Sequence, residues 1–122
     1  MTKRLIVTFE AYDVVTVPFP FTDSSRKKKR PAVILSSSPH FNAKAGHSIM
    51  AMITSAKNTR WPLDVEIADL KKAGLPSESV VRMKLFTLDH RFVVEKIGSL
   101  SVMDRKSVVQ SVRKALSDLE IG

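Results

Sequence analysis

The most concentrated chemistry in this sequence is a run of five cations, Arg26-Lys27-Lys28-Lys29-Arg30. Adjacent like charges repel one another, so the run is predicted to form a solvated loop that attracts a polyanion. Pro31 follows directly, and a proline restricts the residue before it to an extended conformation. Arg30 is therefore the one cation of the run that can be aimed, where the loop enters a strand. Its guanidinium offers a planar fork of donors that suits phosphate oxygens.

The overall composition agrees with a polyanionic partner. The 122 residues include 20 Lys and Arg against 12 Asp and Glu, a net charge of +8. Without the five-cation run, 15 cations face 12 anions, so most of the excess is local. The chain has no cysteine, which excludes disulfides, a thiolate nucleophile and a zinc site with Cys ligands. His40, His47 and His90 match no zinc spacing, so we expect neither a metal nor another cofactor.

The segments that flank the cations are typical of β-strands. Residues 12–19 are rich in β-branched and aromatic side chains, and Pro18 and Pro20 predict a sheet edge or a bend there. The apolar run Ala32–Leu35 predicts a buried strand. Together they predict a hairpin whose long loop carries the cations. Further strands are predicted at 47–54, 63–67, 79–83 and 86–88.

Near the C-terminus, the apolar residues are spaced as in a helix and not as in a strand. Ser101-x-x-Asp104 is typical of a capping box, and apolar residues then recur at helical spacing. We expect one domain, 1–122, that is mainly β with some α. Its barrel or strongly bent sheet covers about residues 10–100, and a C-terminal helix covers about 102–119. The longest apolar run, Ile49–Ile53, is far too short to span a membrane, so we expect a cytoplasmic protein with no membrane partner.

Five motifs follow one another from about Tyr12 to the end of the predicted helix. They are Tyr12-Asp13-Val14-Val15 with Val17-Pro18-Phe19-Pro20-Phe21-Thr22-Asp23; Lys29-Arg30-Pro31-Ala32-Val33-Ile34-Leu35; Met52-Ile53-Thr54-Ser55; Ser79-Val80-Val81-Arg82 with Thr87-Leu88-Asp89; and Lys96-Ile97-Gly98-Ser99-Leu100-Ser101. In this order they resemble the MazF/PemK toxins of toxin–antitoxin systems, and the order makes the resemblance specific.

The resemblance implies an SH3-like small barrel (CcdB/MazF-like) that forms a homodimer. It implies an endoribonuclease that cuts single-stranded RNA (mRNA) at short sequences without a metal, leaving a 2′,3′-cyclic phosphate and a 5′-hydroxyl. It also implies a cognate antitoxin whose disordered C-terminal segment blocks the RNA site, and DNA binding only through the antitoxin complex.

The same resemblance assigns catalytic roles to Arg30, Thr54 and Arg82. RNA carries its own nucleophile, the 2′-hydroxyl, so the reaction needs proton transfer and positive charge at phosphorus rather than a nucleophilic side chain. Arg30 is expected to supply the charge and Thr54 to bind the scissile phosphate. The resemblance also makes Arg82 a second cation of the site, while alternation along the strand indicates only that its side chain faces away from those of its neighbours.

RNA binding is expected from Arg26, Lys27, Lys28 and Lys29. Ser55, the second hydroxyl at the end of its strand, is a weaker candidate than Thr54 for binding the phosphate, and Lys84 is expected to bind RNA phosphate. Some family members carry an Asp, proposed as general base, where this chain has Lys84. A protonated lysine cannot accept a proton, so the base stays open. His90 is either an acid–base group or a surface histidine.

The sequence leaves open the place of Trp61 and two functions other than RNA cleavage. Trp61, the only tryptophan, is expected in the core or at a dimer contact, with base stacking as the other possibility. A CcdB-like gyrase poison shares the fold, but the C-terminal Trp-Gly-Ile of that class is missing from Leu119-Glu120-Ile121-Gly122. A non-catalytic nucleic-acid-binding barrel would bind RNA through the basic loop and leave it intact.

Overall fold

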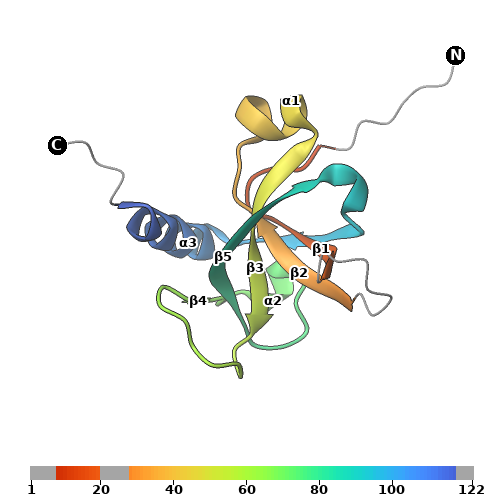
Figure 1. Ribbon diagram of the computed structural model, residues 1–122. Helices are drawn as coiled ribbons and strands as arrows, with labels where there is room; N and C mark the ends of the chain where they lie inside the picture. The colour runs from red at the N-terminus through yellow and green to blue at the C-terminus, as the bar shows by residue number, and fades with distance from the viewer. Residues whose placement is uncertain (1–7, 20–27, 118–122) are drawn as a thin grey trace, which may run out of the picture.

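The structure, a computed structural model, describes residues 8–19 and 28–117. Six antiparallel strands form one curled sheet in the order β4-β5-β3-β2-β1-β6 (Figure 1). The helical elements are a π-helical turn at Ser38–Asn42, α1 (Ala43–Ala45), α2 (Leu70–Ala73), a 3₁₀ turn at His90–Phe92 and α3 (Val102–Ala115). The strands are β1 (Asp13–Phe19), β2 (Lys28–Ile34), β3 (His47–Ser55), β4 (Val65–Glu66), β5 (Ser79–Asp89) and β6 (Glu95–Ser99). The predicted mainly β fold with a C-terminal helix is confirmed.

The central strands are buried on both faces. Val14, Val33 and Ala51 lie side by side in one apolar cluster, and their neighbours Val15 and Ala32 belong to a second cluster on the opposite face. Successive side chains of a strand point to opposite faces, so a sheet that curls around one core and is covered on the other side needs an unbroken apolar run. This explains why the segments 14–17 and 32–35 lack polar alternation.

Two prolines mark where the sheet narrows. β6 pairs with β1 only as far as Thr16, and β3 pairs with β2 only from Ala32 onward. At Pro18, β1 pairs only with β2, and at Pro31, β2 pairs only with β1. Because proline has no N–H, it is tolerated at such a position, where no hydrogen bond to a second strand is lost. The sheet edge predicted at Pro18 is confirmed, and Pro20 lies outside the described residues.

The last cations of the basic run belong to a strand, not to a loop. Lys28, Lys29 and Arg30 begin β2 and pair with Phe19, Pro18 and Val17 of β1. The prediction of a solvated loop is wrong for Lys28 and Lys29, whereas Arg30 lies in the strand that the loop is predicted to enter. The strand places consecutive charges on alternate faces, which separates them more than a coil would. Arg26 and Lys27 lie outside the described residues.

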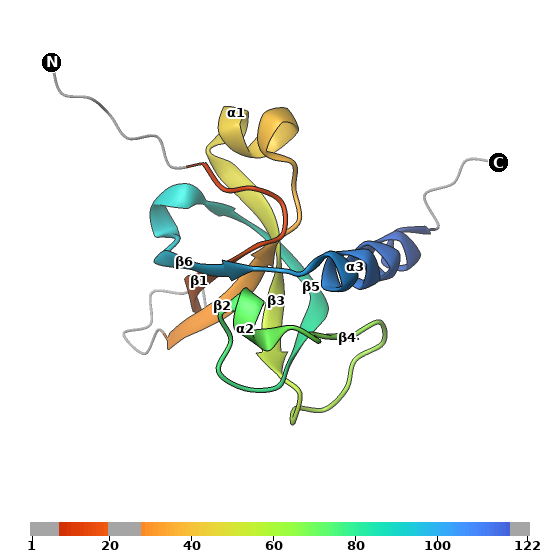
Figure 2. The same ribbon diagram turned by 180° about the vertical axis from the view of Figure 1, so that it is seen from behind.

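The C-terminal helix begins where the capping motif predicts. The Ser101 hydroxyl accepts a hydrogen bond from the Asp104 N–H, at 3.1 Å. The Asp104 carboxylate does not close the box; it is buried and accepts from the N–H groups of Ala68 and Asp69 just before α2. Asp104 thus ties the first turn of α3 to the segment just before α2. Figure 2 shows α2 beside β6 and α3 running away from the sheet, and the described helix ends at Ala115.

Candidate active site

An open cleft of about 200 Å³ lies where β2, β3 and β5 run side by side. The residues that line it are Phe19, Arg30, Met52, Ile53, Thr54, Asn58, Trp61, Arg82 and Lys84. All three residues predicted as catalytic are among them. Three cationic side chains share this small volume, and no carboxylate or imidazole is among the lining residues that the structure describes.

Strand register brings the predicted residues to one face of the sheet. Ala32, two residues after Arg30, pairs with Met52, and Thr54 follows two residues later on β3. Thr54 pairs with Val80, two residues before Arg82 on β5. Each step of two residues keeps the same face, so the side chains of Arg30, Thr54 and Arg82 converge.

A bulge in β5 lies at the same place. The register between β3 and β5 shifts between Ala51 and Ile53, whose partners are Leu85 and Val81. Three residues of β5, Arg82 to Lys84, therefore stand opposite Met52 alone. Bulges bend a strand and re-aim its side chains, and this one directs both Arg82 and Lys84 into the cleft. The sequence predicts two short strands here, but the structure has a single bulged one.

Arg30 and Arg82 differ in how firmly they are held. Arg30 is exposed, and its side chain forms no hydrogen bond or ion pair within residues 8–19 and 28–117. Its five N–H donors are available to an incoming anion. Arg82 has a side chain only 11% exposed and is fixed by several partners. The cleft thus combines one free guanidinium with one anchored guanidinium.

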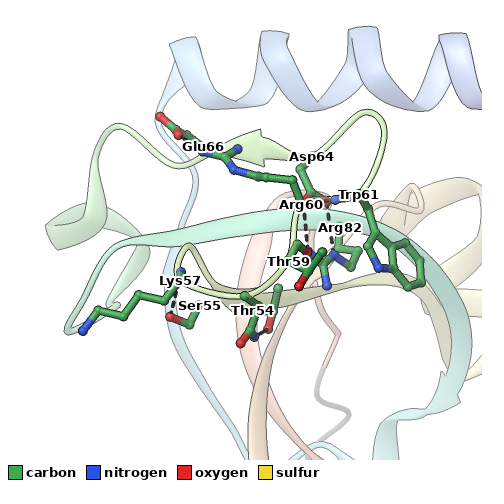
Figure 3. A network of polar contacts seen from close by, with 10 residues as sticks. Thr54, Ser55, Lys57, Thr59, Arg60, Trp61, Asp64, Glu66 and Arg82 are labelled. Atoms are coloured by element: carbon green, nitrogen blue, oxygen red, sulfur yellow. Dashed lines mark hydrogen bonds and ion pairs between the residues drawn. The ribbon is translucent and has the colours of Figure 1, made fainter.

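The anchor of Arg82 is Asp64, from the loop between β3 and β4 (Figure 3). The Arg82 Nε donates to Asp64 Oδ1 at 3.2 Å, and Nη2 donates to Asp64 Oδ2 at 2.9 Å and to the Thr59 carbonyl at 2.7 Å. The Trp61 N–H donates to Asp64 Oδ2 at 2.9 Å. These bonds leave the two N–H groups of Arg82 Nη1 for a ligand.

Both members of this pair are charged at neutral pH. Burial raises the pKa of Asp64, but the hydrogen bonds from Arg82 and from the Trp61 N–H outweigh it, so the pKa lies below the ordinary value of 3.8. The hydrogen bond to Asp64 raises the pKa of Arg82 above its ordinary value. Asp64 is therefore a poor proton acceptor, and its role is to position Arg82.

This pair predicts an acid-sensitive contribution to stability. Because the folded-state pKa of Asp64 is lowered, its ionised form stabilises the fold above pH 3.8, and the contribution is lost as the pH falls through the lower folded-state pKa. We expect Asp64→Asn to reduce stability at pH 7 by about 2 kcal/mol, with the gap to wild type closing below pH 3.8. Urea unfolding at pH 7 and pH 3 measures this. An unchanged gap would contradict the assignment.

Thr54 has its hydroxyl oriented by a neighbour. Asn58 Nδ2 donates to Thr54 Oγ1 at 2.6 Å, so the hydroxyl accepts there and its own proton can be donated elsewhere. Since Thr54 lines the cleft, that proton is available to an anion bound beside the two arginines.

The predicted RNA-binding residues do not all reach the cleft. Lys84 lines the cleft, and its ammonium lies 4.9 Å from the Phe19 ring centre. Ser55 faces the other way, and its hydroxyl accepts from the Lys57 N–H at 3.2 Å. Lys28 and Lys29 are exposed on β2 beside the cleft without lining it.

The loop 56–64 holds two residues that the sequence interpretation missed, Asn58 and Asp64, together with Trp61, for which base stacking was one of the possibilities. It contributes Asn58 and Trp61 to the cleft and Asp64 to the anchor of Arg82. Trp61 is 44% exposed, so it is not a core residue. The Asn, Trp and Asp of this polar loop carry no spacing signal; the loop folds back on the strands, and only that path brings them to Arg82.

His90 lies elsewhere. Its Nε2 is 2.7 Å from the Ser48 hydroxyl, and its ring meets the Phe9 ring edge-on at 5.1 Å between centres. Burial lowers the pKa of His90, against an opposing effect of Asp89. It does not line the cleft. Among the described residues, no three His, Cys, Asp or Glu side chains cluster as metal ligands would.

The fold and the cleft define a small curled-sheet protein with a cationic site at its strand ends. Solved structures share this fold. The MazE–MazF complex from Deinococcus radiodurans matches with a TM-score of 0.73 at 21% identity, over 91% of this chain and 98% of that chain. An endoribonuclease from mycobacterial species, in complex with its cognate antitoxin, matches with a TM-score of 0.70 at 12% identity, over 92% and 96%. At these identities the likeness shows the fold alone.

The family follows from the sequence. The profile of the PemK-like, MazF-like toxins of type II toxin–antitoxin systems matches residues 10–116. The chain belongs to this family. A comparison with curated protein sequences found no match. Within the described ranges, no helix combines the length and apolar character needed to cross a bilayer.

Proposed function

We propose that this chain is a toxin endoribonuclease that cuts single-stranded RNA, including mRNA, at short sequences without a metal ion. The observation that carries the proposal is the convergence of Arg30, Thr54 and Arg82 in one cleft from three neighbouring strands. Family membership supports the same conclusion, and the mycobacterial structural neighbour is itself an endoribonuclease.

In the proposed reaction, the 2′-oxygen attacks the adjacent phosphorus and the bond from phosphorus to the 5′-oxygen breaks. The 2′-hydroxyl loses its proton, the departing 5′-oxygen gains one, and the products are a 2′,3′-cyclic phosphate and a 5′-hydroxyl. Arg30 and the Nη1 group of Arg82 stabilise the charge that builds on the phosphate, and Thr54 donates a hydrogen bond to it. Lys84, Lys28 and Lys29 attract neighbouring phosphates.

We further propose a homodimer and a cognate antitoxin whose disordered C-terminal segment blocks the cleft. An antitoxin accompanies the toxin in the Deinococcus and mycobacterial structural neighbours. The three cationic side chains in the cleft would attract an acidic segment as they attract RNA. Sedimentation of the isolated chain tests the dimer.

The decisive experiment is to incubate the antitoxin-free protein with a long, mixed-sequence single-stranded RNA in excess EDTA and to map every new end. Cuts at one recurring short sequence with 5′-hydroxyl ends would support the proposal. Intact RNA that stays bound, with affinity falling steeply as salt rises, would favour a non-catalytic binding barrel instead. Gyrase-dependent DNA breaks in producing cells would favour a gyrase poison.

Thr54→Val tests the hydrogen bond to phosphate. The change keeps the shape and the β-branch but removes the hydroxyl, so we expect kcat to fall about 10- to 100-fold, which is the range for one hydrogen bond to a charged group. Thr54→Ser, which retains the hydroxyl, should stay within about threefold of wild type. Equal rates for the Val and Ser variants would remove Thr54 from the mechanism.

A further inference from the structure

The loop 56–64 presents an aromatic ring to a cleft that is otherwise cationic. Trp61 is 44% exposed and belongs to neither apolar cluster. The guanidinium carbon of Arg82 lies 4.8 Å from the indole ring centre, so the ring is stacked on the anchored arginine (Figure 3). A large aromatic ring left this exposed beside three cations is unexplained by packing.

The turn that carries Trp61 is rigid. The Asp64 N–H donates to the Trp61 carbonyl at 3.3 Å, while the Trp61 N–H donates to the Asp64 carboxylate at 2.9 Å. Pro62 fixes the first central position of this four-residue turn, and Leu63 at the second has φ +67°. A leucine rarely adopts this left-handed conformation, which costs about 1–3 kcal/mol and persists where the surroundings enforce it.

The indole ring of Trp61 is thus held in place by the turn that carries it and by its contact with Arg82. Arg82 takes part in both halves of the proposed site, because its guanidinium contacts the indole face and its side chain lines the cleft. A phosphate held by Arg82 and Arg30 would therefore bring the attached nucleoside next to Trp61. Aromatic side chains beside cations are how proteins bind the bases of single strands.

We propose that Trp61 is the stacking platform for one nucleobase next to the scissile phosphate, and that Asp64 is the positioning residue that couples this platform to Arg82. The inference rests on the proposed ribonuclease function and extends it. Loop 56–64 then determines which base is accepted beside the cut.

Because Trp61 is the only tryptophan, the fluorescence of the unmodified protein reports on this ring directly. The first probe is a mixed-sequence single-stranded RNA with 2′-O-methyl groups throughout, which has no nucleophile and cannot be cleaved. The matched probe is an abasic sugar-phosphate oligomer of equal length and charge. We expect saturable quenching of at least about twofold by the first and little change with the second. Equal responses to both would overturn the proposal.

Two variants test the same ring in cleavage. Trp61→Leu keeps an apolar side chain but removes the π face, and we expect kcat/KM to fall about 5- to 150-fold, the equivalent of about 1–3 kcal/mol for one stacked base. It should also relax the base preference at one position beside the cut. Trp61→Phe should keep kcat/KM within about threefold of wild type and should keep the base preference. A Leu variant with wild-type kcat/KM and cleavage pattern would overturn the proposal.

The outcomes separate this inference from the proposed function. Wild-type protein that cuts RNA while its fluorescence ignores the bases would refute stacking alone. Protein that cuts no RNA, but whose fluorescence responds to bases and not to the abasic oligomer, would refute the ribonuclease and support stacking. A response to poly-glutamate in place of nucleobases would assign the ring to an acidic protein partner and overturn the inference.

Discussion

Replacing Arg30 with alanine is expected to lower kcat for RNA cleavage by about 10²- to 10³-fold, the range for removing one pre-positioned donor to a charged transition state. Among the described residues, no group forms a hydrogen bond or ion pair with the guanidinium of Arg30, which lies in the first half of β2 directly before Pro31. Its loss should leave KM within a few fold, because other cations still attract the strand. Single-turnover cleavage of a mapped substrate measures the change in kcat.

The control lies one residue away. Lys29→Ala removes the same charge from the opposite face of β2, so it should raise KM and lower the sensitivity of binding to salt, while kcat stays close to wild type. Arg30→Lys keeps the charge but not the planar fork, and we expect an intermediate kcat. If the Lys29 and Arg30 variants lose activity equally, Arg30 acts only through general attraction.

Gly74→Ala is expected to lower the free energy of unfolding by about 3 kcal/mol or more, which is a larger loss than we expect for Asp64→Asn or Gly46→Ala. Gly74 ends α2 with φ +74°, where an L side chain is strained by about 1–2 kcal/mol. A Cβ there would also collide with the Ile97 carbonyl oxygen and lie 2.7 Å from its carbon, because β6 packs directly on the end of α2. Overpacking adds about 1–3 kcal/mol. Urea unfolding gives the difference.

Gly46→Ala is the control that separates backbone strain at a positive φ from the collision with Ile97. Gly46 ends α1 with φ +66°, almost the same conformation, yet a Cβ there would meet nothing within 4 Å. We expect its loss to be about 1–2 kcal/mol, the strain alone. Similar losses for the two variants would show that β6 moves away from α2 without cost.

Much of the fold follows from local patterns. The start of β1 and the whole of β3 follow from apolar and β-branched runs, and the start of α3 follows from Ser101. Predictions failed where pairing overrode local composition. Lys28 to Arg30 form a strand because β1 offers a partner, and the residues around Lys84 continue β5 because a bulge absorbs the change of register.

The sequence by itself determined the types and faces of the predicted catalytic residues. Arg30 before Pro31, Thr54 at a strand end and Arg82 between two apolar residues follow from alternation and from resemblance to the toxin family. Alternation states which face a side chain occupies, but not which residue stands across from it on the next strand.

Only the tertiary structure decided the register and the path of loop 56–64. Register sets Thr54 opposite Val80 and so brings Arg82 to the cleft, while the loop adds Asp64 and Trp61 from a segment with no periodic pattern. Both depend on contacts between residues far apart in the chain. A local pattern cannot encode them, because their energy exists only once the sheet has curled and the loop has folded back against Arg82.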